Sequence, residues 1–560
     1  MSSLEERILE AKGLAIAKAL STGEPVRISV AEVLDRPPRA SDVRSIMDFV
    51  GMVTRGRVAA EVTHPAPISV TRFKTEARPG GFYAVEGVVT SLSEIFLRPT
   101  QYVCDGEYVE EPIPKAKCRP VMESLVRERV ATLAEPPESG RSETLTVVLR
   151  GPLINRLRPG ERVAVSGIAA IRGSKGFRLY LEATGVEKAS EPQLPEPPDL
   201  GPNPVEALVL SLAPSIWGHR IVKEAIVLQL FSAPRIRLRD VSVRGNIHIL
   251  LLGDPGTAKS QLLRAAVSAA PKGILVHGRG ASAAGLTAAV VRDEEGRWTL
   301  EAGAVVLGSG GLVAVDEIEK MRVEDAVALH EAMEQGTVTI SKAGVKATML
   351  ADASILAAAN PAGGRLDDSV TPIEQIRLPA SLLDRFDAIF VTRFPSEAEA
   401  RRAIVRHTLS TLSEPPEPPV SRAEMKAYIA AARRIRPRLG PGALAVLENA
   451  MEEIESRSGG AVTMRQFEAV VRFTLASARA RMSPVASGED ARRAINIVSY
   501  WLADAAGGNP YALAGESTID RYVQQAKWIA RERGIPEDKM ESFIRHYLEK
   551  RGIPVGEIKL

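Results

Sequence analysis

The spacing of apolar residues changes along the 560-residue chain and divides it into segments of different structure. Apolar side chains recur at helical spacing from Leu4 to Leu20 and again over 42–50, which predicts a small helical domain over residues 1–75. From Gly80 the period shortens to that of strands, with runs at 82–89, 145–149, 162–168 and 177–182. Short strands separated by glycine-rich turns predict an OB-type β-barrel over residues 76–190.

Two proline-rich stretches bound the next segment. Six prolines lie between 192 and 204, which predicts a semi-rigid linker over 191–204, and four more lie between 415 and 419. Between them apolar strand-like runs alternate with helical patterns, as in a parallel sheet with helices on both faces. We therefore expect an α/β domain over 205–412, a helical domain over 421–505, and either short helices or a shortened winged helix over 511–560.

Composition narrows the class of protein only slightly. Hydrophobic residues make up 45% and charged residues 25% of the chain, which is typical of globular proteins. We expect a cytoplasmic protein with no membrane partner, because no signal peptide and no apolar run of about 18 residues is visible. The net charge of +3 requires any nucleic-acid partner to meet a local basic surface. Two cysteines predict no disulfide framework and a reducing compartment.

One stretch carries a strong chemical signal. The apolar run 247–252 is followed by G-x-x-x-x-G-K-S and then by a helical pattern, which is the required context of a nucleotide phosphate-binding loop. The backbone N–H groups of such a loop surround phosphates, the lysine reaches the β- and γ-phosphates, and the serine holds Mg²⁺. The predicted ATP-binding residues are Gly253, Asp254, Pro255, Gly256, Thr257, Ala258, Lys259, Ser260 and Gln261.

Polar residues at the ends of later strands fit the same chemistry. Asp316 and Glu317 end the apolar strand 312–315, and we expect Asp316 to complete the Mg²⁺ shell with Ser260 while Glu317 polarises the attacking water. Asn360 ends the next apolar strand and is expected to orient that water. Arg385 and Arg465 are candidate cations for the charge that develops during phosphoryl transfer.

These residues occur in an order that resembles that of AAA+ ATPases. The sequences of the motifs around them are similar to those of the minichromosome maintenance (MCM) family of replicative helicases, in particular archaeal members. The resemblance covers roughly residues 80–505 and is most specific over 205–480. Its motifs lie at 253–260, 282–290, 316–321, 330–335, 341–344, 357–361 and 378–390, with thinner support in the barrel at 158–167 and 180–183.

The resemblance implies a ring of subunits around DNA with ATP bound between neighbours. It assigns Lys259, Ser260, Asp316, Glu317 and Asn360 to the subunit's own site, and Arg385 and Arg465 to the site of the next subunit. The hairpin lysine, Lys342, would contact the DNA phosphate backbone, in a homo-hexamer or in a mixed ring with another MCM subunit.

The chain departs from the family pattern at the metal site of the barrel. Archaeal members usually carry four metal ligands there, but Cys104 and Cys118 are accompanied by Gln101 and Val121. Two thiolates cannot complete a tetrahedral zinc site, so we expect no zinc.

Further departures lie in the motor. Ala326 replaces an arginine thought to assist the neighbouring site, Leu350 and Asp352 replace Asn and Arg, and Ser309 replaces Asp. Together these changes predict a divergent member with an intact site of its own and weakened cooperation between subunits.

Three hypotheses follow. The first is an ATP-dependent DNA helicase or translocase of the MCM type in DNA replication. The second is a divergent homologue that binds ATP and DNA but is inactive or monomeric alone, and the third is an AAA+ remodeller of proteins, against which the barrel and Lys342 argue. The sequence leaves open the oligomeric state, the partner subunits, the polarity of translocation and whether the tail is a true winged helix.

Overall fold

The computed structural model describes most of the chain between Leu4 and Arg545. The residues outside this description are 1–3, 23, 35, 56–57, 110–116, 137–138, 140–142, 173–177, 190–193, 238–241, 279–282, 294–295, 343–344, 368–370, 395–397, 459–462, 506–539 and 546–560. The described residues fall into two compact units. The first comprises 1–193, 281–310 and 335–352, and the second comprises 194–280, 311–334 and 353–560.

The first unit begins with helices α1 (Leu4–Thr22), α2 (Val30–Val33) and α3 (Ala40–Val53). The sequence pattern missed a parallel ribbon beside them, in which β1 (Val26–Ser29) pairs with β2 (Ala60–Thr63). Each strand has four residues, which is too short to show a period of two against the surrounding helical pattern. Helix α4 (Val70–Glu76) and strand β3 (Pro67–Ser69) lead into the barrel.

The barrel closes because β4 (Phe82–Ser93) pairs with two neighbours, β9 (Leu125–Ala134) and β11 (Arg162–Arg172). Strand β10 (Thr144–Arg150) pairs with β9, and β12 (Arg178–Lys188) pairs with β10 and β11, so the ring runs β4-β9-β10-β12-β11. Only the β10–β12 pairing of this ring is parallel. This topology is that of an OB barrel, as the sequence predicted. Its centre is filled by buried side chains such as Val85, Val165 and Leu181.

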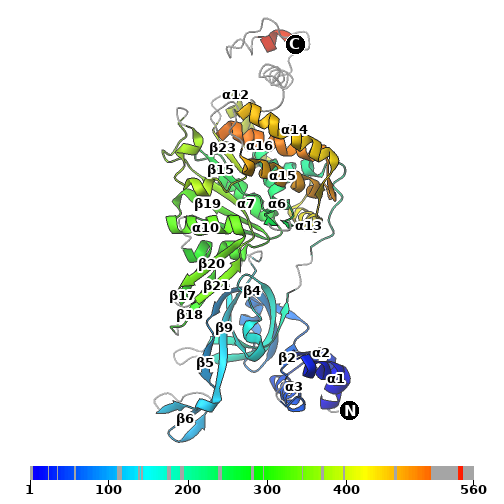
Figure 1. Ribbon diagram of the computed structural model, residues 1–560, viewed down its shortest axis with the longest axis vertical. Coiled ribbons are helices and arrows are strands. Elements are labelled where there is room, and N and C mark those ends of the chain that lie inside the picture. The colour runs from blue at the N-terminus through cyan, green and yellow to red at the C-terminus, as the bar shows by residue number, and fades with distance from the viewer. Residues whose placement is uncertain are drawn as a thin grey trace. The chain divides into compact units, whose positions relative to one another are not determined.

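Short strands extend the first unit beyond the barrel ring (Figure 1). Strand β5 (Phe96–Pro99) pairs with β9. The hairpin of β17 (Ala288–Arg292) and β18 (Trp298–Ala302) adds to β4 on the other side. A further hairpin, β20 (Thr337–Lys342) and β21 (Val345–Leu350), carries the predicted DNA-contacting lysine.

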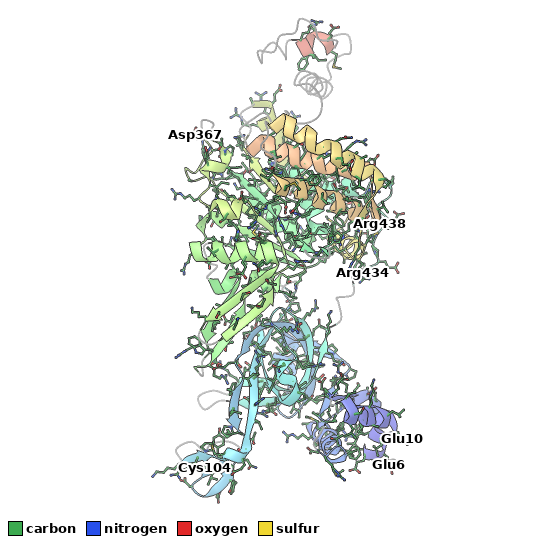
Figure 2. The ribbon with its side chains drawn as sticks, in the orientation of Figure 1. Glu6, Glu10, Cys104, Asp367, Arg434 and Arg438 are labelled. Carbon is green, nitrogen blue, oxygen red and sulfur yellow. A yellow bond between two sulfur atoms is a disulfide. The ribbon has the colours of Figure 1, made fainter. Side chains whose placement is uncertain are left out.

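The two cysteines lie on a small sheet formed by β6 (Tyr102–Cys104), β7 (Glu107–Val109) and β8 (Cys118–Pro120). Cys104 and Cys118 form a disulfide, with their Cα atoms 4.0 Å apart; Cys104 is labelled in Figure 2. The expectation of no disulfide is therefore wrong. The antiparallel register of β6 and β8 sets the two cysteines directly opposite each other, which their separation in sequence conceals.

The second unit is built on a parallel sheet, of which Figure 1 labels β15, β19 and β23. The strand order of this sheet is β16-β19-β22-β15-β23. Its strands are β16 (Gly273–His277), β19 (Leu312–Asp316), β22 (Ser354–Ala359), β15 (Ile249–Gly253) and β23 (Ala388–Thr392). The three central strands β19, β22 and β15 are buried at every residue, which explains their continuous apolar runs. The multidomain α/β prediction is confirmed.

Helices cover the sheet and form the C-terminal part of the second unit. Helix α7 (Lys259–Ala269) follows β15, α10 (Val323–Gln335) follows β19, and α6 (Arg220–Phe231) precedes β15. Helices α13 (Arg422–Ala432), α14 (Pro441–Ser458), α15 (Met464–Ala480) and α16 (Gly488–Ala505) follow the sheet; α15 packs on α6 and α16 on β23. Apart from 540–545, the predicted tail helices lie outside the described residues. No helix in the described parts has the length and apolar character needed to cross a membrane.

Candidate functional site

The turn from β15 into α7 forms the predicted phosphate-binding loop. Gly253 lies so close to β23 that an added Cβ would come within 2.0 Å of the Thr392 carbonyl oxygen, so no side chain fits there. Gly256 has φ +84° and Ala258 has φ +64°. The left-handed conformation is costly for alanine, and such backbone strain is concentrated at binding sites. Thr257 ties the loop to β23 through a 2.9 Å hydrogen bond between its hydroxyl and that of Thr392.

Lys259 lies at the first position of α7 and is buried. Its Nζ donates to the carbonyl oxygens of Gly253 and Asp254, each at 2.7 Å, so the ammonium is folded back onto its own loop. Burial lowers the pKa of Lys259, and the nearby carboxylates of Asp254, Glu319 and Asp316 oppose that shift. A buried cation surrounded by carbonyl oxygens and acids is prepared to exchange some of these contacts for phosphate oxygens.

Two acidic residues, Asp316 and Glu317, lie at the carboxyl end of β19. Asp316 is buried, and its Oδ1 accepts a 3.1 Å hydrogen bond from the Glu317 N–H. Its Oδ2 lies 4.0 Å from Nδ1 of His277. Glu317 has φ +55° and its carboxylate forms an ion pair with Lys320. The strained backbone at Glu317 turns its side chain away from the direction that a continuing strand would give it.

Asn360 lies at the end of β22, the strand next to β19. Its Nδ2 donates to Oε1 of Glu319 at 3.2 Å. Glu319 lies in the short 3₁₀ helix η4 (Ile318–Lys320), directly after the strand-end acids. No role for Glu319 follows from the sequence. It is the third acid of the run D-E-I-E at 316–319, but its contact with Asn360 depends on the order of strands in the sheet.

Arg385 lies at the opposite edge of the sheet. It follows helix α11 (Ala380–Leu383) and precedes β23, whose first residue pairs with Ile249 at the start of β15. Its Nε donates to Nε2 of His330 at 2.9 Å, and its Nη2 pairs with Glu334; both partners lie on α10. The predicted finger arginine is therefore held at the amino ends of the parallel strands.

Arg465 joins Arg385 at this amino edge. It lies in the first turn of α15, and its Nη1 donates to the Asp384 carbonyl oxygen at 3.0 Å. A buried charge cluster supports the same segment: Asp387 accepts from Arg244 at 3.0 Å and from Arg472 at 3.1 Å. Burial lowers the pKa of Arg244 to about 10, and the Asp387 carboxylate opposes that shift.

The cluster also ties the amino edge to the sheet. Asp387 accepts a 2.7 Å hydrogen bond from the N–H of His248, which lies just before β15. The fully buried His248 accepts from Ile355 N–H at Nδ1, so its Nε2 carries the proton that is donated to Met333 of α10. Burial lowers the pKa of His248 well below its ordinary value, which keeps the ring neutral.

The predicted site residues thus form two groups. Lys259, Asp316, Glu317 and Asn360 lie at the carboxyl ends of the strands, and Arg385 and Arg465 at the amino ends. Since β15 has five residues, the two edges are separated by about 16 Å. The two arginines do not contribute to the site that their own sheet forms.

The predicted DNA-contacting lysine and three of the departures from the family pattern belong to neither of these two groups. Lys342 is exposed in β20 and pairs across the hairpin with Val345. Ala326 is buried within α10. Ser309 accepts a 3.1 Å hydrogen bond from the Asp352 N–H, so two of the departing positions contact each other.

A strand–loop–helix with a buried lysine, an asparagine at the end of the neighbouring strand and an acid at the end of the strand beyond it defines a P-loop ATPase domain of the AAA+ class. The family models agree. The MCM P-loop domain matches residues 199–412 and the MCM AAA-lid domain matches residues 423–502. The chain belongs to the MCM family.

Curated relatives come from archaea and eukaryotes. The chain is 37% identical to a minichromosome maintenance protein MCM of Saccharolobus solfataricus, over 71% of this chain and 63% of that protein. It is 31% identical to DNA replication licensing factor MCM7 of Arabidopsis thaliana, over 84% of this chain and 76% of that protein. It is 40% identical to DNA replication licensing factor MCM3 of Entamoeba histolytica, over 58% of this chain and 61% of that protein. The matches thus span about three-fifths of two of these relatives.

Proposed function

We propose that this chain is an ATP-dependent DNA helicase or translocase of the MCM type, acting in DNA replication, and that it hydrolyses ATP between the subunits of a ring. The observation that carries the proposal is the separation of the phosphate-binding loop from Arg385 across the sheet. A subunit that holds ATP at the carboxyl edge needs a cation from elsewhere. A second subunit that presents its own amino edge supplies that cation.

The residues at the carboxyl edge suit Mg²⁺-ATP. Loop 253–261 would surround the phosphates with N–H groups, and Lys259 would leave its carbonyl partners for the β- and γ-phosphates. The Ser260 hydroxyl and the buried Asp316 carboxylate are oxygen donors of the kind that Mg²⁺ prefers, and they would hold it. The bound metal ion would neutralise charge on the phosphates.

The same residues support hydrolysis of the terminal phosphate. Glu317 would accept the proton of the attacking water once its carboxylate separates from Lys320. Asn360 would orient that water. Arg385 and Arg465 of the neighbouring subunit would stabilise the charge that develops on the transferred phosphoryl group. Zinc has no role in this proposal, because Cys104 and Cys118 are joined to each other.

The DNA partner is inferred from the hairpin and the barrel. Lys342 is exposed near the turn of a β-hairpin, where an ammonium can approach phosphates without reading sequence. Whether the ring is a homo-hexamer or includes another MCM subunit is tested by the same experiment that tests activity.

The deciding experiment measures ATP hydrolysis and forked-DNA unwinding by the full chain, alongside its molecular mass by light scattering. We expect DNA-stimulated turnover that is lost in Lys259→Ala, with subunits assembled under turnover conditions. A monomer that binds ATP and DNA without turnover would favour the divergent, inactive homologue. Turnover with no affinity for DNA would favour a remodeller of proteins.

A further inference from the structure

Glu319 occupies an unusual position in the ATP site. Its Oε1 accepts the hydrogen bond from Asn360, whereas its Oε2 is buried and has no hydrogen-bond partner among the described residues. A buried carboxylate oxygen without a donor is costly, and native structures usually place such an atom where a ligand or bound water supplies the missing hydrogen bond. These two observations distinguish Glu319 from an ordinary surface acid of η4 and indicate that it contributes to the ATP site.

The contact with Glu319 fixes the orientation of the Asn360 amide. An ionised carboxylate accepts hydrogen bonds and donates none, so it must face the NH₂ group of Asn360. The amide oxygen of Asn360 is then turned away from Glu319, and one N–H remains available. If Glu319 were removed, this hydrogen bond would no longer determine which way the oxygen and the NH₂ group of Asn360 point.

Glu319 also acts on the lysine of the phosphate-binding loop. Burial lowers the pKa of Lys259, and Glu319 is one of the three carboxylates, with Asp254 and Asp316, that oppose this shift. Glu319 thus lies within electrostatic reach of the ammonium group as well as in contact with the asparagine. The Lys259 ammonium and the Asn360 amide are the two groups that would meet the terminal phosphate of ATP.

We propose that Glu319 is a positioning residue of the ATP site, which holds Asn360 in the orientation that distinguishes ATP from ADP. The inference rests on the proposed function, because it assumes that Asn360 meets the γ-phosphate. In the occupied site the buried Oε2 accepts a hydrogen bond from bound water. Glu319 itself does not touch the nucleotide.

Calorimetric titration of the full chain with Mg²⁺-ATPγS and with Mg²⁺-ADP tests the proposal without relying on turnover. Asn360→Ala should lower the ratio of the two affinities by about tenfold, the value of one hydrogen bond to a charged group. Glu319→Ala should lower it by a similar factor, and the double variant by no more. Glu319→Gln keeps an acceptor oxygen and should lose less than Glu319→Ala.

Three results would overturn the inference: an unchanged ratio in Glu319→Ala, equal losses for both nucleotides, or losses that multiply in the double variant. Glu374→Ala, an exposed acid on the 3₁₀ helix η5 (Pro372–Gln375), is the matched control and should bind as the parent does. Melting temperatures show whether each variant is folded. Failure of the parent to bind ATPγS, or full binding by Lys259→Ala, would instead refute the proposed function.

Discussion

Arg465 donates a hydrogen bond from its guanidinium to the backbone carbonyl of Asp384, although 81 residues separate them in sequence. Since Asp384 directly precedes Arg385, this contact places the first turn of α15 against the segment that carries the finger arginine. The two arginines therefore form one structural group at the amino edge of the sheet, and they should act together on whatever that edge faces.

The first prediction concerns this pair. Arg385→Ala should lower kcat for ATP by about a thousandfold, in the range known for arginine fingers, and Arg465→Ala should lower it in the same assay. Each variant keeps its own phosphate-binding loop, so nucleotide binding should persist. Mixing either variant with Lys259→Ala should restore turnover, because one subunit then supplies the loop and the other supplies the arginines. The measurement is steady-state ATPase activity of mixed and unmixed proteins.

Each protein measured alone is the control for the mixing experiment, and none should hydrolyse ATP at the parent rate. Absence of any recovery, with both variants folded and able to assemble, would show that the arginines do not act across an interface.

The second prediction concerns Asp387, whose side chain is completely buried between Arg244 and Arg472. Asp387→Asn should cost about 3 kcal/mol in the free energy of unfolding, because the buried Arg244 loses its counter-ion and the buried Arg472 keeps only its ion pair with Glu468. It should also impair the arginines of the amino edge, so Asp387→Asn alone should hydrolyse ATP more slowly than the parent, and mixing with Lys259→Ala, which supplies intact arginines, should restore turnover. Urea unfolding and the mixing assay measure the two effects.

Asp384→Asn is the matched control for Asp387→Asn. Its side chain is 74% exposed and lies 4.0 Å from Nη1 of Arg465, a distance at which an exposed ion pair contributes little, whereas the hydrogen bond from Arg465 goes to the backbone carbonyl of this residue. This control should keep both stability and activity. An Asp387→Asn protein as stable as the parent would contradict the importance of the buried cluster.

The sequence predicted the individual site residues better than their grouping. Lys259 and Asp316 could be predicted because each follows an apolar strand in a recognisable local pattern. The separation of Arg385 from Lys259 was implied only by the family resemblance. The local residue pattern does not show it, because it depends on β23 running parallel to β15 and on Arg385 preceding β23. The Glu319–Asn360 contact likewise requires β19 and β22 to be neighbours, which local spacing does not reveal.

The local spacing of apolar residues also explains why the barrel of the first unit was predicted and why its short strand pairings were missed. The barrel strands are long enough to show their period, and the closed ring follows the predicted OB topology. The ribbon of β1 and β2 and the disulfide depend instead on which short segments pair. Which residues pair across these short strands cannot be deduced from the amino-acid composition or from local spacing.

The third prediction separates two lysines of one hairpin. Cross-strand pairs share a face, and the hairpin pairs Lys342 with Val345 but Lys346 with Ser341, so the two lysines lie on opposite faces. If the face of Lys342 meets DNA, Lys342→Ala should lower DNA affinity and reduce the slope of log affinity against log salt by about one. Fluorescence anisotropy over a salt series measures both. Lys346→Ala carries the same charge change and should leave the slope unchanged; equal effects would contradict a specific face.

The fourth prediction concerns the disulfide. Cys104 and Cys118 are 14 residues apart, and closing a loop of that length contributes about 3 kcal/mol by restricting the unfolded chain. Cys104→Ser should therefore increase amide hydrogen exchange in β6 and β8, with little change in the barrel strand β9. The same increase should follow addition of a reductant to the parent, whereas Cys104→Ser should not respond to reductant. Equal exchange in the oxidised and reduced parent would show that strand pairing alone holds this sheet.

The last prediction concerns the pH dependence of stability. Lys223 on α6 is buried and donates to the carbonyl oxygens of Ala213 and Ile216 at 3.0 and 2.7 Å. Burial lowers its pKa from 10.5 to about 8. Between these values the unfolded chain binds more protons at this group than the folded protein does, so its contribution to stability rises with pH and levels off above about 10.5.

Lys223→Met removes this titration while keeping a side chain of similar length. The difference in melting temperature between parent and Lys223→Met should therefore shift in favour of the parent as the pH rises from 8 to 10. Lys426→Met, on helix α13 of the same unit, is the control for loss of a lysine and its charge. A constant difference for Lys223→Met would mean that the ammonium keeps its proton through its two carbonyl contacts, and that burial does not depress its pKa.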